Sequence, residues 1–263
     1  MSLVATHRRV DRRRTARSTR VIVLAGGRGK RLAPFTSVLP KPLLPIGDRA
    51  ILEIVVEQLR QAGFTDITFC VGYLSHLIEA VFGDGSGWDV HIRYVREEGA
   101  LGTAGPLTLV DGLDSTFLVM NGDVLTQLDY ASLVDHHRAS ENIVTIATQR
   151  RTITVDYGVL RLERTGHGYG VSGYDEKPEI QSPVSMGIYV FEPAALDHIP
   201  RGCYFDFPDL VDTLLAAGEP VGAFLYDGLW LDIGRHEEFE RANALWGAAA
   251  NGHGATGNGG LPR

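Results

Sequence analysis

The sequence has few cysteines and no long apolar run. Its 263 residues include only Cys70 and Cys203, which form no CxxC motif and no disulfide framework. No segment approaches the roughly 18 apolar residues that a membrane-spanning helix requires. The first 20 residues contain neither the apolar core nor the cleavage site of a secretory signal. These absences predict a cytoplasmic protein.

Several familiar site motifs are missing as well. The nine histidines form no HExxH or other metal-ligand pattern. A dinucleotide-binding GxGxxG loop would need glycine at Leu32, which argues against an NAD-linked dehydrogenase. A Walker A loop would need glycine at Leu24 and serine or threonine at Arg31. A nucleotide site in this chain must therefore belong to another class.

The net charge of −7 is unevenly distributed. Residues 1–20 contain seven arginines and one aspartate, so the acidic excess lies in residues 21–246. A body of that charge is a poor partner for nucleic acid, and we expect neither a nucleic-acid nor a membrane partner. We predict a disordered basic tail at 1–20, one folded domain at 21–246 and a disordered glycine-rich tail at 247–263.

Short apolar runs alternate with helical patterns along the first half of this domain. The predicted strands are 21–25, 67–71, 91–95 and 117–121, and the predicted helices between them are 51–62, 74–82 and 103–111. This order predicts an α/β fold with a parallel sheet covered by helices on both faces. Helices at 130–139, 207–216 and 236–245 and strands at 143–148, 158–162, 170–174 and 184–191 follow. We expect these later strands to add to the sheet as antiparallel or mixed neighbours.

A glycine-rich turn follows the first predicted strand. Gly26, Gly27 and Gly29 lie within four residues, a composition typical of backbone that approaches a ligand closely and offers N–H groups to phosphate. Arg31 lies two residues beyond this turn. Lys41 stands between Pro40 and Pro42, which hold it in a stiff, extended segment. These cations make a phosphate site a better interpretation than a flexible turn.

Two carboxylates are expected at the edge of the sheet. Asp123 follows the apolar strand at 117–121, and the carboxyl edge of a parallel sheet is where α/β folds bind ligands. Asp232 follows Trp230 and Leu231 in another short strand. Each alone is equally consistent with a turn-capping aspartate, but together they could hold Mg²⁺ against phosphates.

The sequence from residue 24 to 46, LAGGRGKRLAPFTSVLPKPLLPI, resembles the signature of the sugar-phosphate nucleotidyltransferases, also called nucleotide-sugar pyrophosphorylases. The similarity continues, in order, through residues 97–105, 121–123, 157–159, 176–178, 187–189 and 230–234. The similarity covers residues 20–246. Within the family, the sequence most resembles the short mannose-1-phosphate guanylyltransferase type. Seven segments in the family order are far more specific than any one of them.

The resemblance implies a fold and a reaction. The fold would be a Rossmann-like three-layer α/β/α sandwich with a mixed, mostly parallel sheet, of the nucleotide-diphospho-sugar transferase type. The reaction would join a nucleoside triphosphate to a sugar 1-phosphate, releasing pyrophosphate by Mg²⁺-assisted in-line displacement without a covalent intermediate. A homo-oligomer is compatible with the resemblance, because relatives form several assemblies.

The resemblance also assigns residues. The catalytic charges would be Arg31, Lys41 and Asp123, and the metal ligands would be Asp123 and Asp232. Nucleotide-binding positions would be Leu24, Ala25, Gly26, Gly27, Gly29, Lys30, Glu97, Gly102 and Thr103. Sugar-phosphate-binding positions would be Asn121, Gly158, Glu176, Lys177 and Ser185.

The base and the sugar are less constrained than the class of reaction. The Glu97 carboxylate could accept two hydrogen bonds from N1 and N2 of guanine, which favours GTP over UTP, dTTP or CTP. Many relatives have Asn-Ala where this chain has Ser185 and Met186, so the sugar stays open among hexoses, heptoses and cyclitols. The alternatives are a nucleotidyltransferase for an alditol or cyclitol phosphate and a non-catalytic subunit that senses nucleotide sugars.

Overall fold

The computed structural model describes residue 16, residues 19–234 and residues 236–251. Most of the two predicted tails, residues 1–15, 17–18 and 252–263, lie outside the described residues. The C-terminal helix α6 (His236–Asn251) continues past the domain boundary predicted at residue 246. Among the helices described, none combines the length and the apolar character needed to cross a bilayer.

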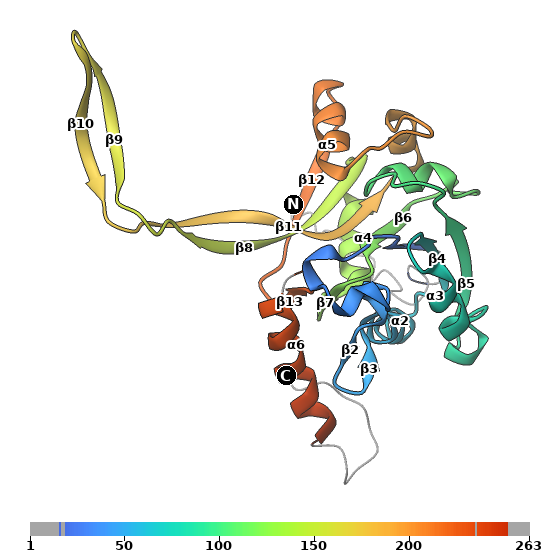
Figure 1. Cartoon of the computed structure of the whole chain (residues 1–263). Coiled ribbons are helices and arrows are strands. Elements are labelled where there is room, and N and C mark those ends of the chain that lie inside the picture. Colours follow the sequence, from blue (N-terminus) through green and yellow to red (C-terminus); the bar gives the residue numbers. More distant parts are fainter. Residues whose placement is uncertain (1–15, 17–18, 235, 252–263) are drawn as a thin grey trace, which may run out of the picture.

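A seven-stranded mixed sheet forms the centre of the molecule, in the order β12-β8-β11-β6-β1-β4-β5 (Figure 1). Its strands are β1 (Val21–Ala25), β4 (Asp66–Val71), β5 (His91–Arg96), β6 (Phe117–Asn121), β8 (Val144–Thr154), β11 (Glu179–Phe191) and β12 (Val221–Leu225). Strands β5, β4, β1 and β6 are mutually parallel, and β8 is parallel to β12. Strand β11 runs antiparallel to both of its neighbours. The predicted mixed, mostly parallel sheet is therefore confirmed.

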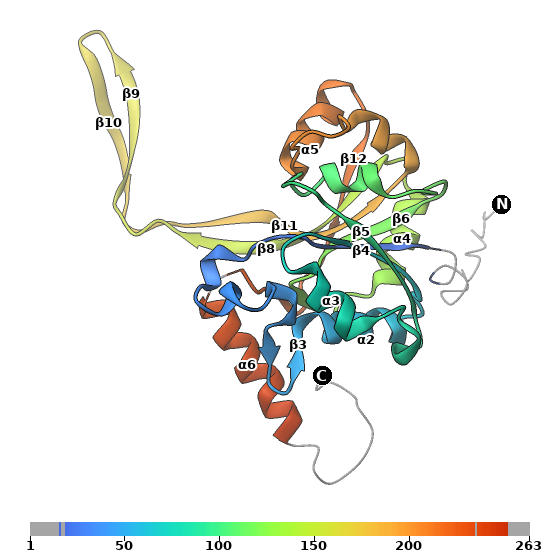
Figure 2. The same ribbon diagram turned by 45° about the vertical axis from the view of Figure 1, so that its right-hand side comes forward.

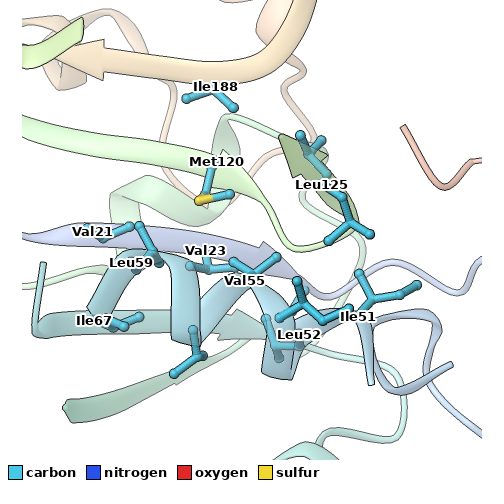
Figure 3. Packing of buried hydrophobic residues seen from close by; sticks show 14 of the residues in the cluster. Val21, Val23, Ile51, Leu52, Val55, Leu59, Ile67, Met120, Leu125 and Ile188 are labelled. Carbon is cyan, nitrogen blue, oxygen red and sulfur yellow. The ribbon is translucent and has the colours of Figure 1, made fainter. Parts of the chain in front are cut away.

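Strand β1 is buried on both faces, and alternate side chains enter two separate cores. Val21 and Val23 join the core that also contains α2, whereas Ile22 joins the core that contains α5. Figure 3 shows the first core, where side chains of α2 pack on those of β1, β4 and β6. This two-sided burial follows from the period of two along a strand and produces the three layers.

In the part of the chain that the structure describes, the longer helices that cover the sheet or close its ends are five α-helices. They are α2 (Ile51–Gln61), α3 (Ser75–Phe82), α4 (Tyr130–Ala139), α5 (Phe207–Ala216) and α6. The helix predicted at 103–111 was wrong in type, because the chain forms only a short 3₁₀ helix, η5 (Gly105–Leu109). The N–H groups of Ala104 and Gly105 both donate to the Phe205 carbonyl at 3.0 Å, so a distant segment fixes the backbone where the helix was expected to begin. The Thr108 hydroxyl donates to the Gly105 carbonyl at 2.8 Å.

Shorter elements complete the fold around the ends of the central strands. They are the strands β2 (Pro45–Ile46), β3 (Arg49–Ala50), β7 (Val124–Thr126) and β13 (Trp230–Asp232) and the 3₁₀ helices η1 (Lys30–Leu32), η2 (Phe35–Ser37), η3 (Lys41–Leu43), η4 (Ser86–Trp88) and η6 (Pro193–His198). The β7–β13 pair connects two regions far apart in sequence, and it bears directly on the site.

Two strands leave the body of the sheet and continue outward. Strand β8 pairs with both β12 and β11 as far as Thr148, and beyond it only with β11. Strands β9 (Val159–Thr165) and β10 (Gly168–Asp175) then form a separate two-stranded sheet. Figures 1 and 2, which differ by a turn of 45°, both show this ribbon standing away from the body. We call residues 149–184 the arm.

The arm corrects one expectation from the sequence. The predicted strands at 158–162 and 170–174 exist, but they pair with each other and not with the central sheet. Alternation of side chains identifies a strand, whereas its neighbours are set by long-range pairing that the pattern does not encode.

Candidate active site

A cleft of about 980 Å³ opens where β1 and β6 end, at the carboxyl edge of the sheet. All nine residues predicted to bind nucleotide line it, as do Arg31, Lys41, Asn121, Asp123 and Asp232. The fold therefore brings residues between positions 24 and 232 together at this edge, which is where open α/β sheets bind their ligands.

The glycine turn is packed directly against the proline-flanked lysine. Gly29 has a φ of 59°, and a Cβ there would lie 2.9 Å from both Cβ of Lys41 and Cγ2 of Thr36. The Thr36 hydroxyl donates to the Gly29 carbonyl at 3.0 Å. Only glycine allows both the left-handed backbone and this close approach. The turn and Lys41 consequently form one rigid wall of the cleft.

Lys41 is a buried cation with a single carboxylate partner among the contacts described. The residue is 8% exposed, and its ammonium group donates to Oδ2 of Asp123. A lysine at this depth is stable only when its charge is compensated, so the ion pair fixes both side chains. The pair places a positive and a negative charge together at the carboxyl edge.

Asp232 lies beside this pair because of a strand pairing. Strand β13 runs antiparallel to β7, and the Ile233 N–H donates to the Asp123 carbonyl at 3.0 Å. Burial raises the pKa of Asp232, and the charge of Asp123 raises it further, while Lys41 and Arg31 oppose the shift. The charge of Asp123 thus disfavours the ionised form of Asp232, and a cation held between the two carboxylates would relieve this repulsion.

The donor set fits a divalent cation that prefers oxygen. Oδ1 of Asp123 is buried and has no hydrogen-bond partner. Within the described part of the chain, no group of three His, Cys, Asp or Glu side chains gathers as a metal site. Mg²⁺ suits this arrangement, since it commonly takes one or two protein carboxylates and completes its shell with water and substrate phosphates.

Glu97 lies against the glycine turn and lines the cleft. A Cβ on Gly26 would lie only 2.3 Å from Oε1 of Glu97. Burial raises the pKa of Glu97, and a long hydrogen bond from the Leu101 N–H, 3.4 Å, opposes this. The carboxylate is thus half-buried, poorly compensated and directed into the cleft, which suits it to accept hydrogen bonds from a ligand.

The structure adds Arg28, Tyr204 and Asp206 to the lining of the cleft. The Arg28 guanidinium carbon lies 5.5 Å from the centroid of the Tyr73 ring. Its position between two glycines of the turn was a usable signal in the sequence. Tyr204 and Asp206 had no such signal, because they are about a hundred residues from the loop that they contact.

Asp206 fixes that loop. Its Oδ1 accepts hydrogen bonds from the backbone N–H of Thr103 at 2.9 Å and from the Thr103 hydroxyl at 3.1 Å. The same hydroxyl accepts from the Phe207 N–H at 2.9 Å, and Tyr204 donates to the other oxygen of Asp206. The Thr103 hydroxyl is therefore already engaged within the protein, so a ligand would meet mainly the loop backbone.

The predicted sugar-phosphate residues are divided between two regions. Asn121 lines the cleft. Ser185 lies near Asn121, because its hydroxyl accepts from the Gly187 N–H at 3.3 Å and a Cβ on Gly187 would lie 2.5 Å from Nδ2 of Asn121. Gly158, Glu176 and Lys177 lie on the arm and do not line the cleft. The structure thus brings two of the five predicted residues to this edge and separates the other three from it.

Sequence similarity to known proteins extends over most of this chain. The sequence model of the family described as nucleotidyl transferase matches residues 20–247. A UTP–glucose-1-phosphate uridylyltransferase of Synechocystis is 35% identical over 243 residues, covering 85% of this chain and 62% of the relative. A mannose-1-phosphate guanylyltransferase of Mycobacterium tuberculosis is 33% identical over 227 residues, covering 85% and 63%. The chain thus spans less than two thirds of these relatives.

Solved structures share the fold over almost their whole length. A Bacillus anthracis protein solved with a sucrose, provisionally described as a glucose-1-phosphate thymidylyltransferase, is 26% identical with a TM-score of 0.68. That match covers 88% of this chain and 96% of the other. HddC from Yersinia pseudotuberculosis, solved with GMP-PN, has a TM-score of 0.64 at 24% identity and covers 87% and 99%. The second likeness concerns the fold alone.

Proposed function

The chain belongs to the nucleotidyl transferase family, and we propose that it transfers GMP from GTP to a sugar 1-phosphate, releasing pyrophosphate. The resemblance drawn from the sequence motifs is thereby confirmed at the level of the family. The activity, the base and the sugar are proposals, because the relatives are longer and their names differ in the nucleotide used. One observation carries the proposal. Lys41 and Asp123 form an ion pair beside Asp232, and all three line the same cleft as the glycine turn.

The proposed reaction is a displacement at the α-phosphorus. A sugar-phosphate oxygen forms a bond to this phosphorus as its bond to the pyrophosphate oxygen breaks. The phosphate is already ionised, so no base has to remove a proton. Lys41 would neutralise charge at the α-phosphate, and Arg31, on the same cleft wall, would neutralise the leaving pyrophosphate.

Asp123 and Asp232 would hold Mg²⁺, whose charge would offset that of the phosphates and help align them. The protein's own contribution is the fixed position of the two carboxylates. The β7–β13 pairing and the Lys41 ion pair hold them before any substrate arrives. Preorganisation of this kind avoids rearranging charges during the reaction.

Glu97 supports GTP as the nucleotide. Guanine presents N1–H and N2–H₂ as adjacent donors, and one carboxylate can accept from both. Thymine and uracil present one ring N–H, so a half-buried carboxylate would be left partly unsatisfied. Such a loss typically costs about 1–3 kcal/mol, or roughly 5- to 150-fold in kcat/KM.

The sugar stays a proposal of class, a hexose, heptose or cyclitol 1-phosphate. Ser185 has a shorter reach than the asparagine of many relatives, and its hydroxyl already donates to Tyr189. The non-catalytic alternative predicts damage among the charged groups of the cleft, and Arg31, Lys41, Asp123 and Asp232 all line it. A cytoplasmic location is likewise proposed, supported by two free cysteines.

A substrate panel tests the function. Purified protein with Mg²⁺ would be given GTP, ATP, UTP, CTP or dTTP together with each of a set of sugar, alditol and cyclitol phosphates. We expect pyrophosphate release only when both substrates are present, and fastest with GTP. Equal kcat/KM for GTP and dTTP would contradict the proposal that Glu97 selects guanine. Failure to bind any nucleotide with Mg²⁺ in calorimetry would contradict the enzyme reading as a whole.

A further inference from the structure

Arg28 lines the cleft as a cation without an acidic partner. It lies between Gly27 and Gly29 in the glycine turn and is exposed. Its guanidinium is instead held over an aromatic ring, with the guanidinium carbon 5.5 Å from the centroid of Tyr73, which lines the cleft as well. No acidic side chain of the described residues pairs with Arg28.

Tyr73 is fixed to both ends of the glycine turn. Its N–H donates to the Gly26 carbonyl at 3.3 Å, and its hydroxyl donates to the Ser37 carbonyl at 3.1 Å. The neighbour of Ser37, Thr36, donates in turn to the Gly29 carbonyl at 3.0 Å. The ring therefore has a set position beside the turn, and a ring face of this kind attracts a guanidinium.

The cleft needs positive charge for the terminal phosphates of a nucleotide. These phosphates carry most of the negative charge of a nucleoside triphosphate, and they leave together as pyrophosphate. Lys41 is already paired with Asp123. Arg31 opposes the rise in the pKa of Asp232, so it too interacts with a carboxylate. Arg28 has no such partner among the described residues, so its full charge is available to an anionic ligand.

The side chain at position 28 has the geometry that a phosphate group requires. A guanidinium presents its N–H donors as a planar fork that matches two phosphate oxygens. Contact with the face of Tyr73 leaves the donors at the edge of the guanidinium free. Lys30 also lines the cleft, but an ammonium is a point charge without this fork.

We propose that Arg28 binds the terminal phosphates of the nucleotide and the pyrophosphate that leaves, and that Tyr73 is the positioning residue that holds its guanidinium over the cleft. The proposal rests on the proposed function, because it names what Arg28 would contact in the nucleotide site. Negative charge passes to the pyrophosphate as its bond to the α-phosphorus breaks, and a guanidinium already in place would stabilise it without rearrangement.

Binding of GTP and GMP tests the contact, because GMP lacks the terminal phosphates. In calorimetry with Mg²⁺, Arg28→Ala should weaken GTP at least about 10-fold and leave GMP within about 2-fold. Arg60→Ala is the matched control, since it removes the same charge near the end of α2, which leads back to the opposite edge of the sheet. It should leave both ligands unchanged. Unchanged binding of GTP to Arg28→Ala, or an equal loss for GTP and GMP, would overturn the proposal.

Two changes at Tyr73 separate its ring from its hydroxyl. Tyr73→Leu removes the ring and should weaken GTP about 2- to 5-fold without affecting GMP. Tyr73→Phe keeps the ring, loses the hydrogen bond to Ser37 and should stay close to wild type. Because Tyr73 would act through Arg28, the loss from Tyr73→Leu should disappear when Arg28 is already alanine. Additive losses in the double variant would overturn the positioning role.

The reverse reaction, in which pyrophosphate and the nucleotide sugar form GTP and sugar 1-phosphate, tests the leaving group directly. Arg28→Ala should raise the KM for pyrophosphate at least about 10-fold and leave that for the nucleotide sugar. Arg28→Lys keeps the charge without the fork, so its KM for pyrophosphate should be intermediate. A raised KM for the nucleotide sugar with an unchanged KM for pyrophosphate would contradict the assignment.

The possible failures are distinct. An active wild type in which Arg28→Ala behaves like Arg60→Ala would overturn the role of Arg28 and leave the proposed function intact. A wild type that binds GTP but releases pyrophosphate with no substrate pair would contradict the proposed transfer, and the comparison of GTP with GMP would still decide what Arg28 contacts. A wild type that binds no nucleotide would overturn both.

Discussion

The cleft and the arm carry two halves of the same predicted site in very different surroundings. In the cleft, Lys41, Asp123 and Asp232 are held by buried strands, an ion pair and a strand pairing between distant segments. On the arm, Glu176 and Lys177 lie on a ribbon of two strands in contact with water, and Lys177 is 57% exposed at its side chain.

The proposed function accounts for this difference. A triphosphate brings a high density of charge, and fixed, partly desolvated countercharges bind it best because they need not rearrange. Glu176 and Lys177, predicted from the resemblance to contact the sugar phosphate, lie on the arm and do not line the cleft. The comparison predicts that changes in the cleft act on chemistry and nucleotide, whereas changes on the arm act on the sugar phosphate.

The largest expected effect is that of Asp123→Ala. The change removes the partner of a buried lysine and one of the two proposed metal ligands, so kcat/KM should fall on the order of 10³-fold or more. Pyrophosphate release measures the loss, and circular dichroism checks that the fold is retained. The exposed Asp114→Ala is the matched control and should be near wild type. If Asp123→Ala kept activity within 10-fold of wild type, the cleft would not be the active site.

A smaller effect is expected from Gly26→Ala. The new Cβ would lie 2.3 Å from Oε1 of Glu97 and must push this carboxylate away. Overpacking of this size costs about 1–3 kcal/mol, so we expect a loss of roughly 5- to 150-fold in kcat/KM for GTP. Gly87→Ala, whose Cβ would meet nothing within 4 Å, should be silent. If calorimetry showed that the variant binds GTP with unchanged affinity, Glu97 would not contact the nucleotide.

The smallest expected effect is a gain in stability from Asp232→Asn. Because burial and the Asp123 charge raise the pKa of Asp232, its ionised form is disfavoured in the folded protein. Wild-type stability therefore falls as the pH rises from the ordinary pKa of an aspartate through the raised one. The variant escapes this loss, so its Tm at pH 7 should exceed that of the wild type by a few degrees.

Two controls sharpen this last prediction. The gain should vanish below the ordinary pKa of aspartate, where Asp232 is protonated in both the folded and the unfolded chain. Mg²⁺ should raise the Tm of the wild type and have less effect on the variant, since ligand binding stabilises the folded state. A variant that is less stable at neutral pH, or that responds equally to Mg²⁺, would contradict the assignment of a carboxylate pair.

Much of the body could be predicted because its local signals agree with its packing. The helix predicted at 207–216 has the observed bounds, and α2 begins at Ile51 as its apolar spacing indicated. The prediction for 103–111 failed because backbone hydrogen bonds from Ala104 and Gly105 to Phe205, a contact far away in the sequence, fix the start of this segment, which forms only a 3₁₀ helix. The path of the arm could not be predicted, since nothing in its alternation says that β9 and β10 pair only with each other.

The cleft was more accessible to sequence reasoning than the arm. Glycines, prolines and an aspartate after an apolar strand carry positional meaning, which is why Gly29, Lys41 and Asp123 meet in the structure. Asp206 was missed because its role is to brace the backbone at Thr103, a contact between segments far apart in the chain. The resemblance identified Glu176 and Lys177, but the motif could not show that they stand away from the cleft.

The division of labour between the two regions is tested most directly by varying one substrate at a time. Pyrophosphate release would be measured for Glu97→Gln and Lys177→Ala with GTP and then the accepted sugar 1-phosphate as the varied substrate. We predict that Glu97→Gln raises the KM for GTP and leaves that for the sugar phosphate, whereas Lys177→Ala does the reverse. Parallel changes in both constants in both variants would contradict the account.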